Sequence, residues 1–305
     1  MSTPQSGILP EGSSAALFLT LTLAPNSTTP SEAREGIRAV PRLTAELSAQ
    51  HPSANLVSVV AIGADCWDVV IGEPKPGELR PFFPLENGGR SAPATEEDIF
   101  VHIRSSRPDL NYLLATHLMA AFGKSVERVE EITGFRYLDN RDLTGFVDGT
   151  ENPEGEERPR VALVGEGDPA FSGGSFVHIQ RYEHRMENWQ KVDVAEQERV
   201  IGRTKVDNVE MEDDLRPPTA HISRVDIKDE HGKQEILRHS MPYGDTSRAG
   251  LYFVAYGASP APFENMLKRM ILADDQGHFD HLLKYTRAVT GAAFFAPSLE
   301  FLSTI

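Results

Sequence analysis

The sequence predicts an α+β protein made of two structurally related halves. Strand-like and helix-like segments follow one another in a similar order before and after residue 152, although the halves share no sequence identity that we can detect. Residues 152–159 are rich in proline, glycine and glutamate, which is typical of a connection between domains. We therefore expect an N-terminal half at residues 1–152 and a C-terminal half at residues 153–305.

The first half begins with residues 15–24, in which apolar and polar side chains alternate as in a half-buried strand. A helix is predicted from residue 30 to about residue 50, because Ser31 can serve as its N-cap and apolar residues recur at helical spacing. The remaining predicted elements are strands at 55–62, 65–71 and 98–103, a helix at 111–122 and an extended stretch at 126–137.

The second half repeats this alternation of strands and helices. Its most apolar segment, residues 250–256, predicts a buried strand. The other predicted strands are residues 174–182, 220–227 and 235–241, and the predicted helices are residues 188–201, 262–273 and 279–289.

The composition describes an acidic globular protein. The chain has 305 residues, a hydrophobic fraction of 40% and a formal net charge of −15. Such a charge repels nucleic-acid phosphates and anionic lipid headgroups, so we expect neither nucleic acid nor a membrane as a partner. The single cysteine, Cys66, excludes an internal disulfide and suits the reducing cytoplasm, where we expect the protein to reside. We find no secretory signal and no run of eighteen apolar residues.

The segment GFVDGTENP, residues 145–153, places Asp148 between two glycines. Glycine permits backbone conformations that other residues avoid, so the aspartate can be presented on a tight turn with its carboxylate in a cavity. The alternative is an ordinary Asp-Gly turn, which is common in loops.

His221 is the histidine that best suits a ligand role. It follows the segment RPPTA at the predicted start of a strand, where a side chain can project into a pocket. The alternative is a histidine of purely structural function, as we expect for His117 on the apolar face of its helix.

Arg238 and Ser240 lie in the segment LRHSMPYG, residues 237–244. Strand alternation places both side chains on one face, with His239 on the other. Together they can orient a small polar ligand, whereas an isolated surface arginine would merely pair with a carboxylate.

In combination, GFxDGTxNP, the histidine of HIxR and LRxSMPYG resemble the dye-decolourising peroxidase family. The similarity extends to IGRTK at 201–205, to 250–256 and to the segment around 282–291, and it therefore covers most of the chain. The compact length and the Arg-x-Ser arrangement resemble the bacterial type-B subgroup. The resemblance implies duplicated ferredoxin-like halves of the dimeric α/β-barrel-like superfamily, each an antiparallel sheet flanked by helices, with haem b in the C-terminal half.

The resemblance also implies roles for the three segments. His221 would be the axial ligand of the haem iron, with its second ring nitrogen held by a carboxylate. Asp280 is our candidate for that carboxylate, and Glu264 is the alternative. Asp148 would move a proton of hydrogen peroxide and Arg238 would stabilise the departing oxygen. Ser240 would hold a water, although many family members carry asparagine there.

Further positions follow from the same resemblance. Arg203 is a candidate partner of the haem propionates, with backbone near the haem edge from Gly149, Thr150 and Glu151. Phe253 is a candidate haem wall, together with Phe263, Met266 and Leu283. Aromatic residues that could carry electrons from bulky donors are Trp189, Tyr243, Tyr252 and Tyr285, although each is also a normal packing residue.

The activity implied is oxidation of dyes, phenols or other one-electron donors by hydrogen peroxide through an oxoferryl porphyrin-radical intermediate. A homo-oligomer is expected. Targeting to an encapsulin shell is doubtful, because residues 301–305 follow Pro297 so closely that almost no C-terminal tail remains.

Two alternatives to a peroxidase remain open. A haem carrier or an enzyme that releases iron from haem would share the fold and His221, but would not need Asp148 and Arg238. A non-haem metal protein could use His178 and His184, which lie near acidic residues but lack the spacing of zinc enzymes.

Overall fold

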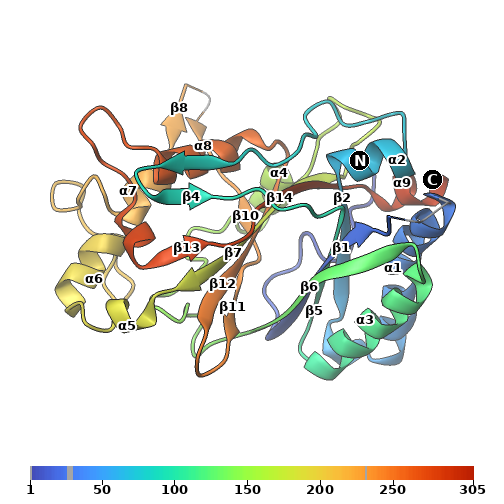
Figure 1. Ribbon diagram of the computed structural model, residues 1–305, viewed down its shortest axis with the longest axis horizontal. Helices are drawn as coiled ribbons and strands as arrows, with labels where there is room; N and C mark the ends of the chain where they lie inside the picture. Colours follow the sequence, from blue (N-terminus) through green and yellow to red (C-terminus); the bar gives the residue numbers. More distant parts are fainter. Residues whose placement is uncertain (1, 26–29, 231) are drawn as a thin grey trace.

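The computed structural model describes residues 2–25, 30–230 and 232–305. Its centre is a sheet of ten strands whose longest path runs β10-β12-β7-β14-β2-β5-β1-β6. All strand pairs within this sheet are antiparallel. Helices cover the outer faces of the sheet at both ends of the molecule (Figure 1).

The first half has the order strand, helix, strand, strand, helix, strand. Its elements are β1 (Ala15–Leu23), α1 (Pro30–Gln50), β2 (Val57–Gly63), β5 (Ile99–Ser105), α3 (Pro108–Phe122) and β6 (Val126–Phe135). In the sheet β1 lies between β5 and β6, and β2 lies beyond β5. This is the βαββαβ topology of a ferredoxin-like fold. Apolar residues of α1 and α3 pack against one face of these strands.

The second half has the same strand arrangement. β7 (Ser175–His184) lies between β12 (Ala249–Gly257) and β14 (Ala292–Ala296), and β10 (Leu237–Arg238) lies beyond β12. Helix α8 (Ala261–Ile271) follows β12 and packs on the outer face of this half. The predicted α+β fold of duplicated ferredoxin-like halves is therefore confirmed, whereas the division at residue 152 remains a prediction.

Strand β14 joins the two halves, because it pairs with β7 on one side and with β2 on the other. Side chains from both halves then share one interior core. Phe18 and Phe100 come from the first half, and Tyr252 and Phe294 from the second. The molecule thus has one apolar core on the inner face of the sheet, shared by both halves. Each half has a further apolar core between the outer face of the sheet and its helices.

Smaller elements connect these strands. They are η1 (Pro52–Ala54), α2 (Ala64–Val70), β3 (Leu85–Asn87), β4 (Arg90–Ala92), α4 (Glu157–Ala162), α5 (Met186–Trp189), α6 (Val194–Ile201), α7 (His221–Val225), β8 (Lys228–Asp229), β9 (Gly232–Lys233), β11 (Met241–Gly244), η2 (His281–Lys284), β13 (Thr286–Ala288) and α9 (Leu299–Thr304).

The predicted strand at residues 65–71 is wrong, because these residues form helix α2. Cys66, Trp67 and Val70 are buried, and this spacing places them on one side of a helix. Trp67 fixes the helix by packing against Phe295 and Phe301. Cys66 is buried, which raises the pKa of its thiol and leaves it unreactive.

Three predicted elements of the second half are also different. Residues 220–227 contain the short helix α7 in place of a strand, and residues 279–289 contain η2 and β13 in place of a helix. Residues 188–201 are not one helix, because Asp193 caps a new helix by accepting a hydrogen bond from the Glu196 amide. The predicted strand at residues 235–241 is present only in part: β10 lies within this segment and β11 begins at its last residue, with His239 and Ser240 between the two strands.

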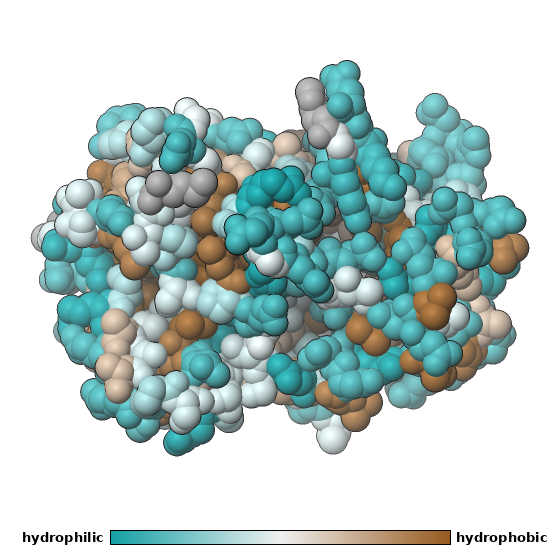
Figure 2. All heavy atoms as spheres, turned by 180° about the vertical axis from the view of Figure 1, so that it is seen from behind, coloured by the Kyte–Doolittle hydropathy of each residue, from teal (hydrophilic) through white to brown (hydrophobic). Residues whose placement is uncertain are grey.

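The surface carries mainly polar side chains. On the face shown in Figure 2, hydrophobic residues are scattered among charged ones. Within the described part of the chain, no helix is both long and apolar enough to span a bilayer.

Candidate active site

His221 is the first residue of α7, which begins directly after the extended Ala220. Its Nδ1 lies 2.6 Å from Oδ2 of Asp280, and Asp280 has no accessible surface. The other oxygen of Asp280 accepts a hydrogen bond of 2.9 Å from the Leu282 amide at the start of η2. The carboxylate is therefore held by backbone, and it in turn orients the imidazole.

The opposite ring nitrogen of His221 has no hydrogen-bond partner among the described residues. A quarter of the side chain is accessible. An imidazole that is anchored through Nδ1 and free at Nε2 is suited to bind a metal. The alternative carboxylate, Glu264, does not contact His221, because both of its oxygens accept hydrogen bonds of 2.7 Å from Arg80.

Asp148 is presented by the turn that the glycines of the GFVDGTENP segment predict. Gly145 has a φ of +90° and Gly149 a φ of +81°, which favour glycine on both sides of the aspartate. Oδ1 of Asp148 lies 3.8 Å from Nη1 of Arg238. The pair thus brings together two sequence segments that are about ninety residues apart.

The environment raises the pKa of Asp148. Burial of the carboxylate is the largest cause, the charge of Arg238 opposes it, and the nearby Asp142 adds to the rise. Nevertheless, 26% of the Asp148 side chain and 23% of the Arg238 side chain remain accessible. The Asp148 carboxylate is therefore largely desolvated by its surroundings, although part of the side chain still reaches the surface.

Asn152 fixes the relation between the two segments, a role that we did not predict. Its Nδ2 donates to the Arg238 carbonyl and its Oδ1 accepts from the Arg238 amide, both at 2.8 Å. The side chain therefore replaces a neighbouring strand at this point of β10. The sequence motif contains this asparagine, but nothing in the local sequence indicates that it bonds to the backbone of Arg238.

Ser240 follows β10, and its hydroxyl accepts a hydrogen bond of 3.3 Å from the Val254 amide. Arg238 and Ser240 are both partly accessible, whereas His239 between them is buried. The role of Ser240 in holding a water remains a prediction.

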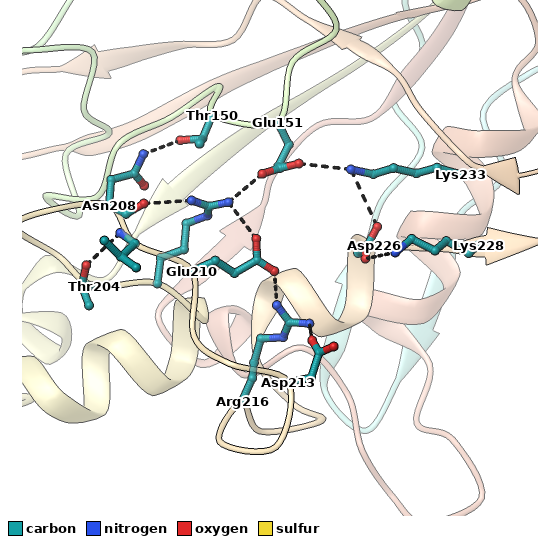
Figure 3. A network of polar contacts seen from close by, with 12 residues as sticks. Thr150, Glu151, Thr204, Asn208, Glu210, Asp213, Arg216, Asp226, Lys228 and Lys233 are labelled. Carbon is teal, nitrogen blue, oxygen red and sulfur yellow. Dashed lines mark hydrogen bonds and ion pairs between the residues drawn. The ribbon is translucent and has the colours of Figure 1, made fainter.

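Arg203 belongs to the network of polar side chains around Glu151 and Glu210 that Figure 3 shows. Its Nη2 donates to Glu151 at 2.6 Å and to Glu210 at 2.9 Å, and its Nη1 donates to the Asn208 carbonyl. Glu151 also accepts from Lys233, and Glu210 from Arg216. The structure thus places Arg203 next to Glu151 and shows that its guanidinium binds two carboxylates; its predicted role toward the haem propionates stays a prediction.

Thr150 and Gly149 lie at the edge of the same network. The Thr150 hydroxyl accepts a hydrogen bond from the Asn208 side chain. Gly149 has no side chain, and the nearest atom to its missing Cβ is the Asn152 amide nitrogen at 3.8 Å. The turn therefore leaves its backbone uncovered between Asp148 and Arg203.

The predicted apolar wall lies under α8. Phe263 and Leu283 are buried, whereas Phe253 and Met266 are partly accessible within the same apolar cluster. Phe253 and Phe263 have ring centroids 5.8 Å apart. These side chains form an apolar surface on the same half of the molecule as His221 and Asp280.

The chemistry of the candidate residues fits a haem group. His221 offers a free nitrogen anchored by a buried carboxylate, and Arg238 makes no guanidinium hydrogen bond within the described residues. Partly accessible apolar side chains lie nearby. His178 and His184 do not form a metal site, because the described residues contain no cluster of three metal-binding side chains.

The family models decide the assignment. Residues 5–136 match the model "Dyp-type peroxidase, N-terminal" and residues 139–301 match "Dyp-type peroxidase, C-terminal". The chain belongs to the Dyp-type peroxidase family.

Individual proteins agree with this assignment. The chain is 39% identical to a dye-decolorizing peroxidase of Mycobacterium tuberculosis over 291 residues, covering 94% of this chain and 86% of that protein. It superimposes with a TM-score of 0.95 on the encapsulated Dyp-type peroxidase of Mycobacterium smegmatis, at 38% identity and with 99% and 98% of the chains covered. The TM-score is also 0.95 for a DypB variant of Rhodococcus jostii RHA1 in complex with haem, at 39% identity and with 99% and 98% covered.

The enzyme class and the cofactor predicted from the sequence are thereby confirmed. The protein is a haem peroxidase of the dye-decolourising type, an oxidoreductase that depends on hydrogen peroxide.

Proposed function

We propose that His221 would bind the haem iron and that Asp148 and Arg238 would activate the hydrogen peroxide that reacts there. The observation that supports this most directly is the pairing of the two charged groups: a desolvated Asp148 carboxylate faces an otherwise unpartnered Arg238 guanidinium at 3.8 Å. When bound, haem supplies the iron at which the peroxide bond is cleaved and stores the oxidising equivalents.

Asp148 accepts the proton that hydrogen peroxide loses and returns it to the departing oxygen. A raised pKa suits this task, because the carboxylate must both take up and release a proton. Arg238 stays charged at every relevant pH, and its free N–H groups stabilise the negative charge that develops on that oxygen. Asn152 keeps Arg238 in place through its two backbone hydrogen bonds.

Asp280 makes His221 a stronger electron donor to the iron, since a carboxylate on Nδ1 increases the basicity of the imidazole. Arg203 binds a haem propionate in competition with Glu151 and Glu210. Phe253 and Met266 supply the apolar wall.

The reductants that we propose are dyes, phenols and other one-electron donors. We also propose a homo-oligomer that resides in the cytoplasm; encapsulation is a property of the Mycobacterium smegmatis protein, and we do not propose it for this chain.

Rapid mixing of the purified holoenzyme with hydrogen peroxide tests this function. We expect a rapid change in the Soret band, followed by return to the resting spectrum when a phenol is added. A haem carrier or an iron-releasing enzyme would give neither the rapid change nor turnover of the phenol. A donor screen across pH then identifies the preferred reductant.

A further inference from the structure

Tyr256 and His102 form a buried hydrogen-bonded pair behind the active site. His102 lies on β5 of the first half and Tyr256 on β12 of the second, and both face the interior core. Nδ1 of His102 lies 2.9 Å from the Tyr256 hydroxyl oxygen. Neither residue has more than 1% of its surface accessible.

The pair is close to Arg238 through the sheet. Tyr256 is the direct partner of Leu237 in the β10–β12 register, and Ala255 is the partner of Arg238. The ring of His239, the residue after Arg238, lies 5.6 Å from the ring of Tyr256. Because side chains alternate along a strand, Tyr256 and Arg238 lie on opposite faces of the same pair of strands.

The hydrogen bond has a preferred direction. Nε2 of His102 is buried and has no partner among the described residues. If Tyr256 donates to Nδ1, one buried group, the Nε2 N–H, is left unpaired. If instead Nδ1 carried the proton, both the tyrosine O–H and the Nε2 lone pair would be unpaired. The first arrangement leaves fewer buried polar groups unsatisfied, so Tyr256 is the donor.

His102 is also a neutral base. Burial lowers the pKa of His102 well below its ordinary value, and the charges of Arg104 and His239 act in the same direction. An imidazole in this state has a lone pair available for the tyrosine proton.

This combination matters for electron transfer from tyrosine. A tyrosine that loses an electron becomes a very strong acid, so its oxidation is easiest where a base accepts the phenolic proton. Two of the other aromatic candidates donate to backbone carbonyls instead: the Tyr243 hydroxyl donates to Tyr182, and the Trp189 N–H donates to Thr144. Within the described part of the chain, Tyr256 is the tyrosine whose hydroxyl contacts an imidazole.

We propose that Tyr256 and His102 are a redox site that donates one electron to the active site after its oxidation by hydrogen peroxide. The O–H bond of Tyr256 breaks, the electron reduces the oxidised haem site by one equivalent, and the proton forms an N–H bond at Nδ1 of His102. The products are a neutral tyrosyl radical and a histidinium. A one-electron donor later reduces the radical, and the proton returns to the tyrosine oxygen.

The surroundings make this step reversible. A histidinium at position 102 lies close to the buried cation Arg104 and in an apolar core, which favours return of the proton. The pair therefore passes an oxidising equivalent on and does not trap it, because the proton stays available for return to the tyrosine oxygen. The inference rests on the proposed function, because that reaction supplies the oxidant.

Electron paramagnetic resonance of the holoenzyme tests the proposal. The sample is mixed with one equivalent of hydrogen peroxide without a reductant and frozen. We expect a tyrosyl radical whose signal narrows when the protein carries ring-deuterated tyrosine. Tyr256→Phe should lose this signal while keeping the Soret band and the rapid reaction with peroxide. Tyr252→Phe is the matched control, because Tyr252 lies on the same face of β12 as Tyr256 and stacks on Phe18, as His102 also does, and it should keep the signal.

His102→Phe provides a second variant that retains an aromatic ring beside Phe18. It should reduce the yield of the radical and change the g-tensor component that reports hydrogen bonding to the phenoxyl oxygen. An unchanged signal in Tyr256→Phe, or no tyrosyl radical in a wild-type protein that reacts with peroxide, would overturn the inference and leave the proposed function intact. A wild-type holoenzyme that does not react with peroxide would refute both.

Discussion

Nδ1 of His221 lies 2.6 Å from a carboxylate oxygen of Asp280 that water cannot reach. The carboxylate is fixed by the Leu282 amide, so the imidazole is oriented before any ligand binds. This contact connects α7, where the sequence predicts a strand, with η2, where the sequence predicts a longer helix.

Removal of the imidazole should abolish stable haem binding. We expect His221→Ala to lose most of its Soret absorbance, since the iron then lacks its protein ligand. Reconstitution with haem and titration by absorbance measure the effect. A His221→Ala protein with the wild-type spectrum would show that another residue is the ligand.

Asp280→Asn should weaken the iron site by about 10–100-fold in affinity or activity, the usual effect of losing a carboxylate behind a metal-binding histidine. The amide keeps the shape of the side chain but cannot accept a full charge-assisted hydrogen bond. Glu264→Gln is the matched control, because Glu264 pairs with Arg80 and does not contact His221. Equal effects of both substitutions would contradict a specific role of Asp280.

Asp148→Asn and Arg238→Leu should each slow the reaction with hydrogen peroxide by about 100-fold or more, the range reported for a single proton-transfer or charge-stabilising group. Haem content should be unchanged in both variants. Stopped-flow measurement of the second-order rate constant compares them.

The pH dependence separates the two roles. Asp148 must be ionised to accept a proton, and its pKa is raised, so wild-type activity toward peroxide should fall as the pH drops through that pKa. Asp148→Asn should lose this acidic limb, whereas Arg238→Leu should keep it. An acidic limb that persists in Asp148→Asn belongs to another group.

Asn152→Ala should displace Arg238 and should affect the reaction with hydrogen peroxide only through that displacement. The substitution removes both hydrogen bonds to the Arg238 backbone, and we expect a loss of about 1–3 kcal/mol in stability. The peroxide reaction should also slow. Asn265→Ala is the control, since Asn265 makes a single side-chain bond to Gln234. Unfolding in urea and stopped-flow kinetics report the two effects separately.

The stability of the protein should decrease as the pH rises toward neutrality because of Glu97. Burial and the nearby Glu130 raise the pKa of Glu97 from 4.5 to about 7, although a hydrogen bond from Thr95 and the charge of Arg181 oppose the shift. Between these values the folded state binds a proton that the unfolded state does not, so the folded state is favoured at low pH and loses this advantage as the pH rises through 7.

Glu97→Gln should remove this dependence. The difference in the free energy of unfolding between pH 5 and pH 8 should shrink by at most about 3 kcal/mol, which is the free energy of a pKa shift of this size. Urea unfolding at both pH values measures it, and Glu86→Gln on the exposed β3 serves as control. No difference between Glu97→Gln and wild type would show that Glu97 titrates normally.

The periodicity of the sequence predicts the long strands and helices well. β1 and α1 lie within the predicted segments, and β2 and α3 overlap theirs over most of their length. The two helices each bury one apolar face, whereas the two strands are buried on both faces, so β1 is more deeply buried than the alternation of its residues predicts. The short elements are missed for a physical reason: a helix of one or two turns, such as α2 or α7, has too few residues to show a period. Its conformation is set by tertiary contacts.

The site was predictable in its residues but not in its contacts. His221, Asp148 and Arg238 are recognisable because the family's motifs contain them. The two bonds of Asn152 to Arg238 and the hydrogen bond between His102 and Tyr256 join residues 86 and 154 positions apart. Nothing in the local sequence of either partner indicates such a pair.

The position of β14 has a consequence for how the protein is made. This strand comes after all others in the sequence, yet it lies between β7 and β2 and supplies the hydrogen bonds that connect the halves. During synthesis on the ribosome, the first half can therefore form its four strands early, and Gln5 and Gly7 already bond to the middle of the β2 edge. The end of that edge, at Ile62 and Gly63, gains its partner only when β14 has emerged, so the two halves are joined in the last step of synthesis.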